Sequence, residues 1–364
     1  MMMHLSEPLR QYADEQCSAR EAQRQAEFIA FGPIVFQVSR LMVKWGILEL
    51  LRDEALTSDE IAQRVGISPY AAKCLLEASL TIGSVLVEPE TGRYGISKTG
   101  WFLLNDPATR VNLDFNHDVN YLGMYDLEAA LKEGRPAGLK RLGDWPTVYE
   151  GLSRLPEDAR RSWFAFDHFY SDSSFDDALR LVFANRPRTL MDVGGNTGRW
   201  AMQCVAHDKE VEVTIVDLPQ QLELMRRQTS GKKGADRIHG HAANLLDEAC
   251  LLPADRHWDA IWMSQFLDCF SEEQITSILR RAARVMDNDS RLYIMETLWD
   301  RQRFEPAAFC LTQVSLYFTA IANGNSKMYN SDDLIALIEK AGLEVEEIVD
   351  GLGQGHSIIK VKRS

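Results

Sequence analysis

A glycine-rich segment in the second half of the chain, TLMDVGGNTGRWAMQCV at residues 189–205, constrains the fold more than any other part of the sequence. Its apolar start indicates a buried strand, and the residues from Arg199 indicate a helix. Between them, Gly194, Gly195 and Gly198 let the backbone turn tightly and let a ligand approach the main chain. The first N–H groups of the helix have no partner within it. The segment therefore predicts a ligand site at a strand-to-helix turn.

The spacing of this turn narrows the class of ligand. Such turns occur in sites for NAD, FAD and S-adenosylmethionine (SAM), but the spacing from Asp192 is D-x-G-x-N-x-G, which differs from the G-x-G-x-x-G of dinucleotide-binding proteins. Asn196 replaces the middle glycine, and asparagine tolerates a positive φ. The next predicted strand ends in Asp217 and Leu218, where an acid can bind both ribose hydroxyls and an apolar side chain can flank adenine. These residues predict an adenosine ligand without deciding between NAD and SAM.

Strands and helices alternate from about residue 187 to the end of the sequence. This alternation predicts a doubly wound α/β sheet, whose ligands bind beyond the carboxyl ends of the parallel strands. The expected helices include Glu272–Val285 and Ser331–Ala341. The expected strands are Arg188–Val193, Val211–Asp217, Arg237–Ala242, Asp259–Leu267, Arg291–Thr297, Glu344–Val349 and Ser357–Val361.

The first third of the chain predicts a winged helix, that is, a helix–turn–helix followed by a hairpin. Its second helix, SPYAAKCLLEASLTIG, carries one lysine and one glutamate, whereas a helix that reads DNA normally carries several basic and amide side chains. We therefore favour a packing or dimerisation module over a DNA-binding one. The expected elements are a helix from Phe31 to Leu51, helices that begin after Thr57 and Ser68, and β segments at 85–87 and 93–96.

Composition limits the partners of the protein. A net charge of −13 over 364 residues disfavours nucleic acid and anionic membranes, since phosphate binding needs clustered lysine and arginine. The six cysteines are scattered without metal-site spacing, so we expect reduced thiols and no metal. The N-terminus is too polar for a signal peptide, and no apolar run reaches the ~18 residues of a membrane span. We expect a cytoplasmic protein.

The motifs MDVGGNTG, VDLP and DAIWMSQFLDCFSEEQ, together with the winged helix, resemble one family over nearly the whole chain. This family is the SAM-dependent small-molecule O-methyltransferases of the plant caffeate and bacterial polyketide type. The resemblance implies a winged-helix dimerisation domain at residues 1–105 that forms an intertwined homodimer and does not bind DNA. It also implies a helical segment at 106–180 that contributes to the substrate pocket. Residues 181–364 would form a class I methyltransferase domain, Rossmann-like, with seven strands of which the last is antiparallel.

The same resemblance implies a set of SAM-binding residues and S-adenosylhomocysteine as the product. The three glycines of the turn would cradle the carboxypropyl group, and Asp217 would hold the ribose. The motif that approaches adenine in the family resembles Asn244-Leu245-Leu246 here, with asparagine in place of aspartate. The implied cofactor residues are Asp192, Gly194, Gly195, Gly198, Asp217, Leu218, Asn244, Leu245, Ser264 and Gln265.

The catalytic position departs from the family pattern. Plant members end the fourth strand in Leu-His-Asp-Trp, and their histidine takes the phenol proton; the matching residue here is Asp268. A base helps because a phenol has a pKa of about 10, while a free aspartate, at about 3.9, is a weak base unless burial raises its pKa. The alternative is an N-cap-like carboxylate before the helix that begins after Ser271.

Two further residues are candidates for the base. Glu296 ends the fifth strand and matches a glutamate that flanks the catalytic histidine in the plant enzymes. His356 opens the last strand, whose antiparallel direction brings its start to the sheet edge where the other strands end. A hydrogen-bonded loop histidine is the alternative interpretation of His356.

Candidate substrate contacts come from two segments that the family uses around its substrate. One is FAFDHFY, with His168, and the other is FCLTQVSLYFTAIANGNSKMY, with Gln313, Tyr317 and Asn323. Simple core packing is the alternative for the second segment. Asn330 and Asp333 are assigned to the cap of the following helix.

The leading functional hypothesis is methyl transfer from SAM to a hydroxyl of a small aromatic or polyketide-like metabolite. The missing histidine leaves open methylation at a ring carbon, or another chemistry on the same fold with SAM bound. A more distant alternative is a ligand-responsive DNA-binding regulator, which the acidic net charge disfavours.

Overall fold

The computed structural model describes residues 7–15 and 17–364 and divides the chain into two compact units. One unit is Asp14–Asp118, and the other combines the residues up to Ala13 with Val119–Ser364. The helices of the smaller unit are α1 (Ala19–Ala30), α2 (Gly32–Lys44), α3 (Ile47–Asp53), α4 (Ser58–Val65), α5 (Pro69–Ile82), α6 (Lys98–Asn105) and α7 (Pro107–Phe115). Its strands are β1 (Val85–Glu88) and β2 (Arg93–Ile96), which pair antiparallel.

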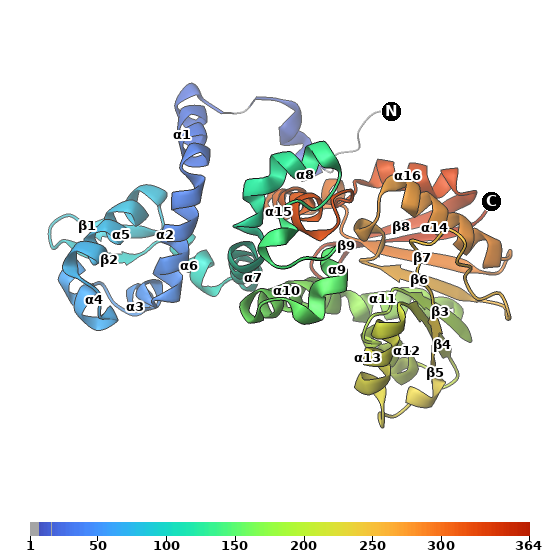
Figure 1. Cartoon of the computed structure of the whole chain (residues 1–364). Helices are drawn as coiled ribbons and strands as arrows, with labels where there is room; N and C mark the ends of the chain where they lie inside the picture. The colour runs from blue at the N-terminus through green and yellow to red at the C-terminus, as the bar shows by residue number, and fades with distance from the viewer. Residues whose placement is uncertain (1–6, 16) are drawn as a thin grey trace. The chain divides into compact units, whose positions relative to one another are not determined.

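The predicted helix–turn–helix and hairpin of the smaller unit are confirmed (Figure 1). Thr57 caps α4 through a reciprocal pair of bonds with Glu60, and Gly66 ends the helix at φ 74°. The prediction of one helix from Phe31 to Leu51 is wrong, because Gly46 adopts a left-handed φ of 71° and separates α2 from α3.

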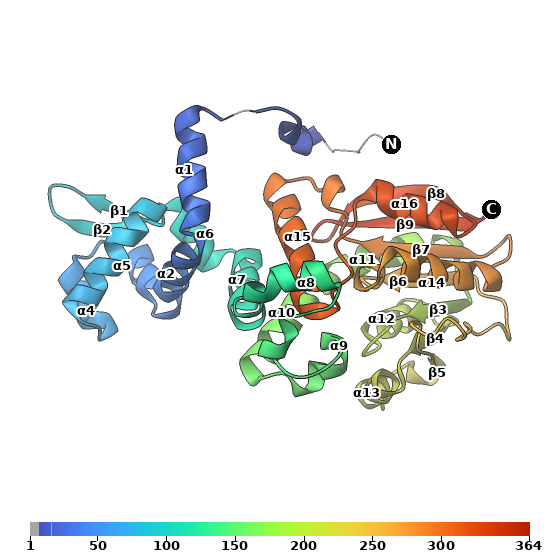
Figure 2. The same cartoon turned by 45° about the horizontal axis from the view of Figure 1, so that its top comes forward.

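The larger unit contains the predicted α/β sheet, with strand order β5-β4-β3-β6-β7-β9-β8 (Figure 2). The last strand, β9, runs antiparallel to both of its neighbours, while the pairs from β5 to β7 are parallel. This is the predicted seven-stranded sheet with a reversed last strand. The strands are β3 (Thr189–Val193), β4 (Glu212–Asp217), β5 (Ile238–Ala242), β6 (Ala260–Ser264), β7 (Arg291–Glu296), β8 (Leu343–Leu352) and β9 (His356–Arg363).

One strand is shorter than its sequence indicates. The apolar run 259–267 predicts a strand up to Leu267, but β6 ends at Ser264. Gln265 leaves the strand at a φ of 45°, and Leu267–Cys269 forms a turn of 3-10 helix. The departure places Asp268 outside the sheet, on the connection to α14 (Glu272–Val285).

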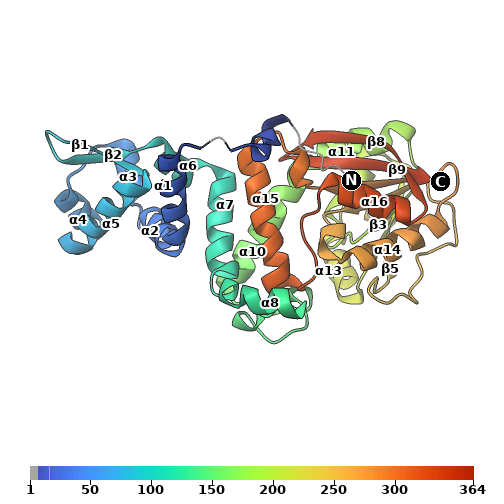
Figure 3. The same ribbon diagram turned by 90° about the horizontal axis from the view of Figure 1, so that it is seen from above.

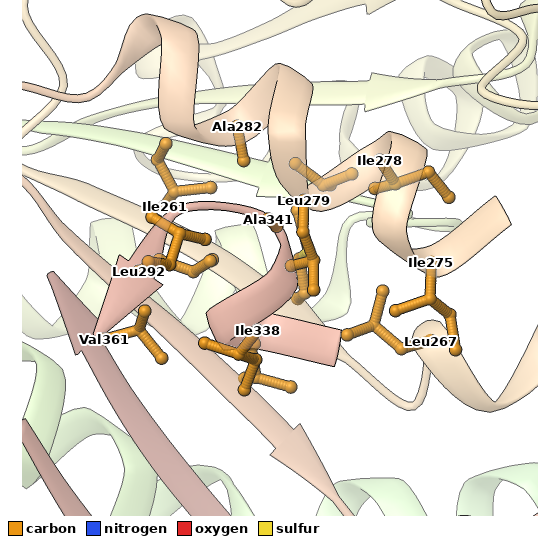
Figure 4. Packing of buried hydrophobic residues seen from close by; sticks show 14 of the residues in the cluster. Ile261, Leu267, Ile275, Ile278, Leu279, Ala282, Leu292, Ile338, Ala341 and Val361 are labelled. Atoms are coloured by element: carbon orange, nitrogen blue, oxygen red, sulfur yellow. The ribbon is translucent and has the colours of Figure 1, made fainter. Parts of the chain in front are cut away.

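Helices cover both faces of the sheet (Figure 1). On one face, α14 and α16 (Ser331–Lys340) pack apolar side chains onto the strands; Figure 4 shows Ala282 of α14 near Ile261 of β6. On the other face, α11 (Phe175–Val182), α12 (Arg199–His207) and α13 (Pro219–Thr229) cover the strands. There, Trp200 of α12 stacks on Trp262 of β6 with ring centroids 4.4 Å apart.

A helical layer adjoins the sheet in the larger unit. Its elements are a 3-10 helix at Glu7–Ala13, α8 (Leu127–Glu133), α9 (Val148–Gly151), α10 (Glu157–Ser171) and α15 (Glu305–Tyr317). A π-helical turn, Phe318–Ala322, continues α15, and α8 lies across that end (Figure 3). Among the described residues, no single helix is long and apolar enough to cross a membrane, although α1 and α2 pass that test as a pair bent by 74°.

Arg281 of α14 holds the loop that follows β5, which includes the predicted adenine contact Leu245. Its guanidinium, 4% exposed, donates to the carbonyl oxygens of Leu245 (2.6 Å), Asp247 (3.0 Å) and Cys250 (3.0 Å). The three bonds fix the backbone of this loop at the sheet edge.

We predict that Arg281→Leu lowers the free energy of unfolding by roughly 3 kcal/mol. The variant leaves one buried and two partly buried carbonyl oxygens without their donor, and a buried carbonyl left without a partner costs about 1–3 kcal/mol. Urea titration of both proteins measures the difference. Arg284→Leu, at an exposed arginine of the same helix, is the matched control. Equal losses in the two variants would contradict the role of Arg281.

Candidate active site

The glycine-rich turn after β3 has the geometry that its sequence predicts. Gly194 has a φ of 79°, and a Cβ there would overlap the ring of Phe266. A Cβ at Gly195 would overlap the carboxylate of Asp192. Asn196 adopts a φ of 48°, which confirms the expected left-handed position. Both positions therefore require glycine, because the side chains of Phe266 and Asp192 approach the main chain closely there.

Asp217 joins this turn to the end of β4. Its Oδ2 accepts the N–H of Asn196 (2.8 Å), and its Oδ1 accepts the N–H of Leu218 (2.7 Å). Burial raises the pKa of Asp217, although the two N–H donors oppose the rise. Each carboxylate oxygen keeps a second lone pair, so the carboxylate can also accept hydrogen bonds from ribose hydroxyls.

Asp192 is a buried carboxylate beneath the turn. It is 2% exposed, and its Oδ2 has no hydrogen-bond partner among the described residues. Burial, and then the charge of Asp217, raise its pKa to about 8. An unpartnered carboxylate next to a glycine turn fits a ligand that brings a cationic or hydrogen-donating group, because such a group supplies the missing partner.

The ends of β5 and β6 continue the same edge of the sheet. Asn244 and Leu245 follow β5, and Asn244 accepts the N–H of Leu246 (3.1 Å). Ser264 is the last residue of β6, and the Oε1 of Gln265 is buried without a partner among the described residues. The neighbouring strands β5, β4, β3 and β6 thus carry all the predicted cofactor residues on one edge. With an amino group, a ribose and a positive charge, SAM fits the acidic and unpartnered groups there.

Two buried carboxyl groups lie beyond β6 and β7. Glu296, the last residue of β7, is 4% exposed; its Oε1 accepts the N–H groups of Phe266 (3.0 Å) and Leu267 (2.8 Å), and its Oε2 has no partner among the described residues. Asp268 is 6% exposed and accepts the thiol of Cys269 (3.4 Å). Asp268 does not cap α14, since Ser271 does so in a reciprocal pair with Gln274, and the N-cap interpretation of Asp268 is wrong.

These two carboxyl groups differ in basicity. Burial raises the pKa of Asp268 to about 6, while burial and the charge of Asp268 raise the pKa of Glu296 well above its usual range. Neighbouring carboxyls in a site poor in water cannot both ionise easily, so they separate into an acid and a base. Glu296 is therefore the weaker acid of the two, and Asp268 is the member that ionises first as the pH rises.

The structure does not bring His356 together with this pair. Glu296 pairs with Ser357 across the β7–β9 ladder, so the neighbouring His356 points to the opposite face of the sheet. There its Nδ1 lies 2.8 Å from the Oγ of Ser174, and its Nε2 has no partner among the described residues. Burial lowers the pKa of His356 to about 4, which keeps the ring neutral.

The predicted substrate residues fall in three places. Tyr317, 4% exposed, accepts the indole N–H of Trp163 (2.7 Å), and Asn323 donates to the carbonyl of Cys269 (2.6 Å). Asn323 therefore lies beside the turn that carries Asp268. Burial raises the pKa of Tyr317, and the charges of Cys269 and Asp268 contribute to this rise. Gln313 is exposed on α15. His168 of α10 lines a cavity of about 580 Å³ beside the end of the glycine-rich turn, together with residues that include Gly198, Arg199 and Lys232.

Tyr149 and Cys269 also lie in the neighbourhood of Asp268 and Tyr317, although the sequence did not predict them as site residues. Tyr149 is on the short helix α9, and its buried hydroxyl lies next to the Cys269 thiol. The sequence around Tyr149 contains no motif that indicates a functional residue. Cys269 was predicted only to be one of six reduced thiols without metal-site spacing. Among the described residues, no cluster of three or more His, Cys, Asp or Glu side chains could hold a metal ion.

Comparison with known proteins identifies the family. Residues 23–94 match the family described as "Dimerisation2-like domain", and residues 157–344, more than half of the chain, match "O-methyltransferase domain". The demethylspheroidene O-methyltransferase of Cereibacter sphaeroides is 25% identical over 346 residues, which cover 94% of this chain and 83% of the relative. The mitomycin biosynthesis 6-O-methyltransferase of Streptomyces lavendulae is 23% identical and covers 88% of this chain and 89% of the relative.

Solved structures share the fold. NcsB1, an O-methyltransferase from neocarzinostatin biosynthesis solved with SAM and 2-hydroxy-5-methyl naphthoic acid, matches with a TM-score of 0.65 at 18% identity, over 90% of this chain and 96% of that chain. The sheet and its ligand-binding edge define a SAM-dependent methyltransferase of the class I, Rossmann-like fold. The chain belongs to the O-methyltransferase family.

We predict that SAM raises the melting temperature of the wild-type protein and that Asp217→Ala abolishes this rise. The variant removes the carboxylate that can accept hydrogen bonds from the ribose hydroxyls. The same carboxylate accepts a hydrogen bond from the N–H of Asn196. Differential scanning fluorimetry with and without SAM measures both shifts. An undiminished rise in the variant would exclude Asp217 from the SAM site.

A second prediction concerns Asp192 and pH. Since the folded protein binds this proton more tightly than the unfolded chain, ionisation lowers stability as the pH rises from about 4 to about 8, by at most ~1.4 kcal/mol per pH unit. Asp192→Asn should therefore weaken the loss of melting temperature between about pH 5 and about pH 8, measured without SAM. The exposed Asp236→Asn is the control. If Asp192→Asn leaves the pH dependence of the wild type unchanged, the account of Asp192 is wrong.

Proposed function

We propose that this methyltransferase transfers the methyl group of SAM to a hydroxyl of a small aromatic or polyketide-like metabolite, with Asp268 as the proton acceptor. The observation that carries the proposal is the buried pair of Asp268 and Glu296 next to the cofactor edge. Two relatives support transfer to oxygen, since their names specify a demethylspheroidene O-methyltransferase and a 6-O-methyltransferase of mitomycin biosynthesis. NcsB1, solved with 2-hydroxy-5-methyl naphthoic acid, supports an aromatic acceptor.

The residues of the chain contribute positioning and proton transfer. Bound SAM supplies an electrophilic methyl group. Asp268 takes the proton of the acceptor hydroxyl as the hydroxyl oxygen gains the methyl, and S-adenosylhomocysteine is the product. Glu296 holds the turn that carries Asp268 by accepting hydrogen bonds from the N–H groups of Phe266 and Leu267. Burial keeps water away from both groups and brings the pKa of Asp268 closer to that of the proton donor.

The proposal assigns the cofactor to the edge formed by Asp192, the glycine-rich turn, Asp217, Leu218, Asn244, Leu245, Ser264 and Gln265. It assigns the acceptor to the space beside Tyr317 and Asn323, with His168 and Gln313 as outer contacts. Asn323 supports this assignment, because its amide ties the end of α15 to the backbone of Cys269.

We further propose a cytoplasmic homodimer. Residues 1–105 would form a winged-helix dimerisation domain, 106–180 a helical segment of the substrate pocket, and 181–364 the SAM-binding domain. In the free chain α1 has no buried residue, and large apolar side chains are exposed at Phe28, Ile29, Phe31 and Ile34. Large apolar side chains exposed so close together in the sequence are typical of an interface. All six cysteines are free, which is compatible with a reducing compartment.

We predict that Asp268→Asn reduces kcat by about 10²–10⁴-fold, the usual contribution of a general base, while SAM binding is kept. Asparagine has nearly the same shape but cannot accept the proton. Methyl transfer from labelled SAM measures kcat, and the SAM-induced melting shift is the control for an intact cofactor site. Full turnover in the variant would mean that Asp268 is not the base.

The alternative function, methylation at a ring carbon, was left open by the absence of the usual histidine at position 268, whereas the O-methyltransferase relatives favour transfer to oxygen. Product NMR with ¹³C-methyl SAM separates the two functions. We predict a methyl resonance in the region of aryl methyl ethers. A resonance in the region of methyl groups bound to ring carbon would contradict O-methylation.

A further inference from the structure

The start of α11 is tied to the turn between β8 and β9 by side chains that are far apart in the sequence. Ser174 directly precedes α11 and His356 opens β9; both are fully buried, and the Oγ of Ser174 lies 2.8 Å from the Nδ1 of His356. The same hydroxyl donates to the carbonyl oxygen of Leu352, the last residue of β8 (3.4 Å). One serine hydroxyl therefore connects both ends of the β8–β9 turn to the helix.

This use of Ser174 departs from the usual role of a serine at the start of a helix. A serine at the N-cap normally accepts an N–H group of the first helical turn and stabilises the helix locally. The side chain of Ser174 makes no such bond within α11. Its hydroxyl is directed to the β8–β9 turn instead, so it fixes where α11 begins relative to the sheet.

The β8–β9 turn is itself held in place and can serve as an anchor. The side-chain amide of Gln302 donates to the carbonyl oxygens of Leu298 and Gly355, both at 2.8 Å, and joins the turn to the segment after β7. On its other side the turn approaches α11 closely, because a Cβ at Gly353 would overlap the hydroxyl oxygen of Ser174. The turn is therefore fixed between the end of β7 and the start of α11.

The start of α11 forms part of the wall of the cavity of about 580 Å³ beside the glycine-rich turn. Phe175, which follows Ser174, lines this cavity, and Gly198 lines it from the glycine-rich turn. Phe175 also packs against Trp200 of α12, with ring centroids 5.4 Å apart. The position of α11 therefore sets the width of the cavity, and the contacts of Ser174 hold α11 in that position.

We propose that His356 and Ser174 are positioning residues of the cofactor site, whose contact holds α11 at the distance from the glycine-rich turn that admits the carboxypropyl end of SAM. This inference rests on the proposed cofactor site and does not depend on the identity of the acceptor. It gives His356 a role in cofactor binding, on the sheet face opposite to that of Glu296, in place of the predicted role as a base.

The test compares two ligands that differ at this end of the cofactor. S-adenosylhomocysteine carries the carboxypropyl group, whereas 5′-methylthioadenosine has only a methyl group on the same sulfur. We expect Ser174→Ala to raise the Kd of S-adenosylhomocysteine about three- to tenfold, as for the loss of one hydrogen bond, and to leave the Kd of methylthioadenosine within about twofold of the wild type. Calorimetry measures both constants, with displacement titrations for the weaker ligand.

Two variants of His356 separate its Nδ1 contact from the polarity of its side chain. Asparagine places an amide atom near the position of Nδ1 and can keep a hydrogen bond to Ser174, whereas glutamine places its amide near the position of Nε2. We expect His356→Asn to bind S-adenosylhomocysteine like the wild type and His356→Gln to lose affinity as Ser174→Ala does. At saturating SAM, the kcat of Ser174→Ala should stay near the wild-type value while the KM for SAM rises, since the contact does not involve Asp268.

Ser79→Ala is the matched control, because Ser79 of α5 is fully buried and its hydroxyl has no partner among the described residues. It should bind both ligands like the wild type. A wild-type Kd for S-adenosylhomocysteine in Ser174→Ala would overturn the proposal, and so would an equal weakening of both ligands, which would indicate a general loss of structure. Equal losses in the two His356 variants would contradict the role of the Nδ1 contact. If the wild type binds neither ligand, the proposed cofactor site fails, and this inference fails with it.

Discussion

The bonds from Glu296 to the N–H groups of Phe266 and Leu267 hold the site together. They join the end of β7 to the segment where the chain leaves β6, and this segment carries Asp268. Because the carboxyl accepts two N–H groups through one oxygen, the turn is fixed without a charged partner for the other oxygen. The interaction therefore both positions Asp268 and leaves a buried acid beside it, which is the condition for a carboxylate that titrates near neutral pH.

Two other carboxylates at this edge of the sheet are also buried and keep lone pairs without a hydrogen-bond donor. Asp192 lies under the glycine-rich turn with one oxygen unpartnered, and Asp217 holds the turn through Asn196. A site with this surplus of acceptors is complementary to a cationic, hydroxyl-bearing cofactor.

Sequence reasoning predicted what depends on local pattern. The α/β sheet could be predicted from the alternation of strands and helices, and the left-handed Asn196 and the caps at Thr57 and Ser271 could be predicted from residue type. Sequence reasoning failed where contacts between residues far apart in the sequence determine the local structure. The turn at Gln265 requires pairing with Met295, and the opposite orientation of His356 depends on the register with Glu296, neither of which is written in a local motif. Tyr149 comes from an unremarkable short helix, and only the packed fold brings its hydroxyl to Cys269.

The central claim is that a buried aspartate replaces the usual histidine as the base, and the pH dependence of kcat/KM tests it most directly. The account predicts a rate that rises with pH through about 6 in the wild type, where Asp268 ionises, and a residual rate without this rise in Asp268→Asn. If the rise near that pH persists unchanged in the variant, another group is the proton acceptor, and the account of the site is wrong.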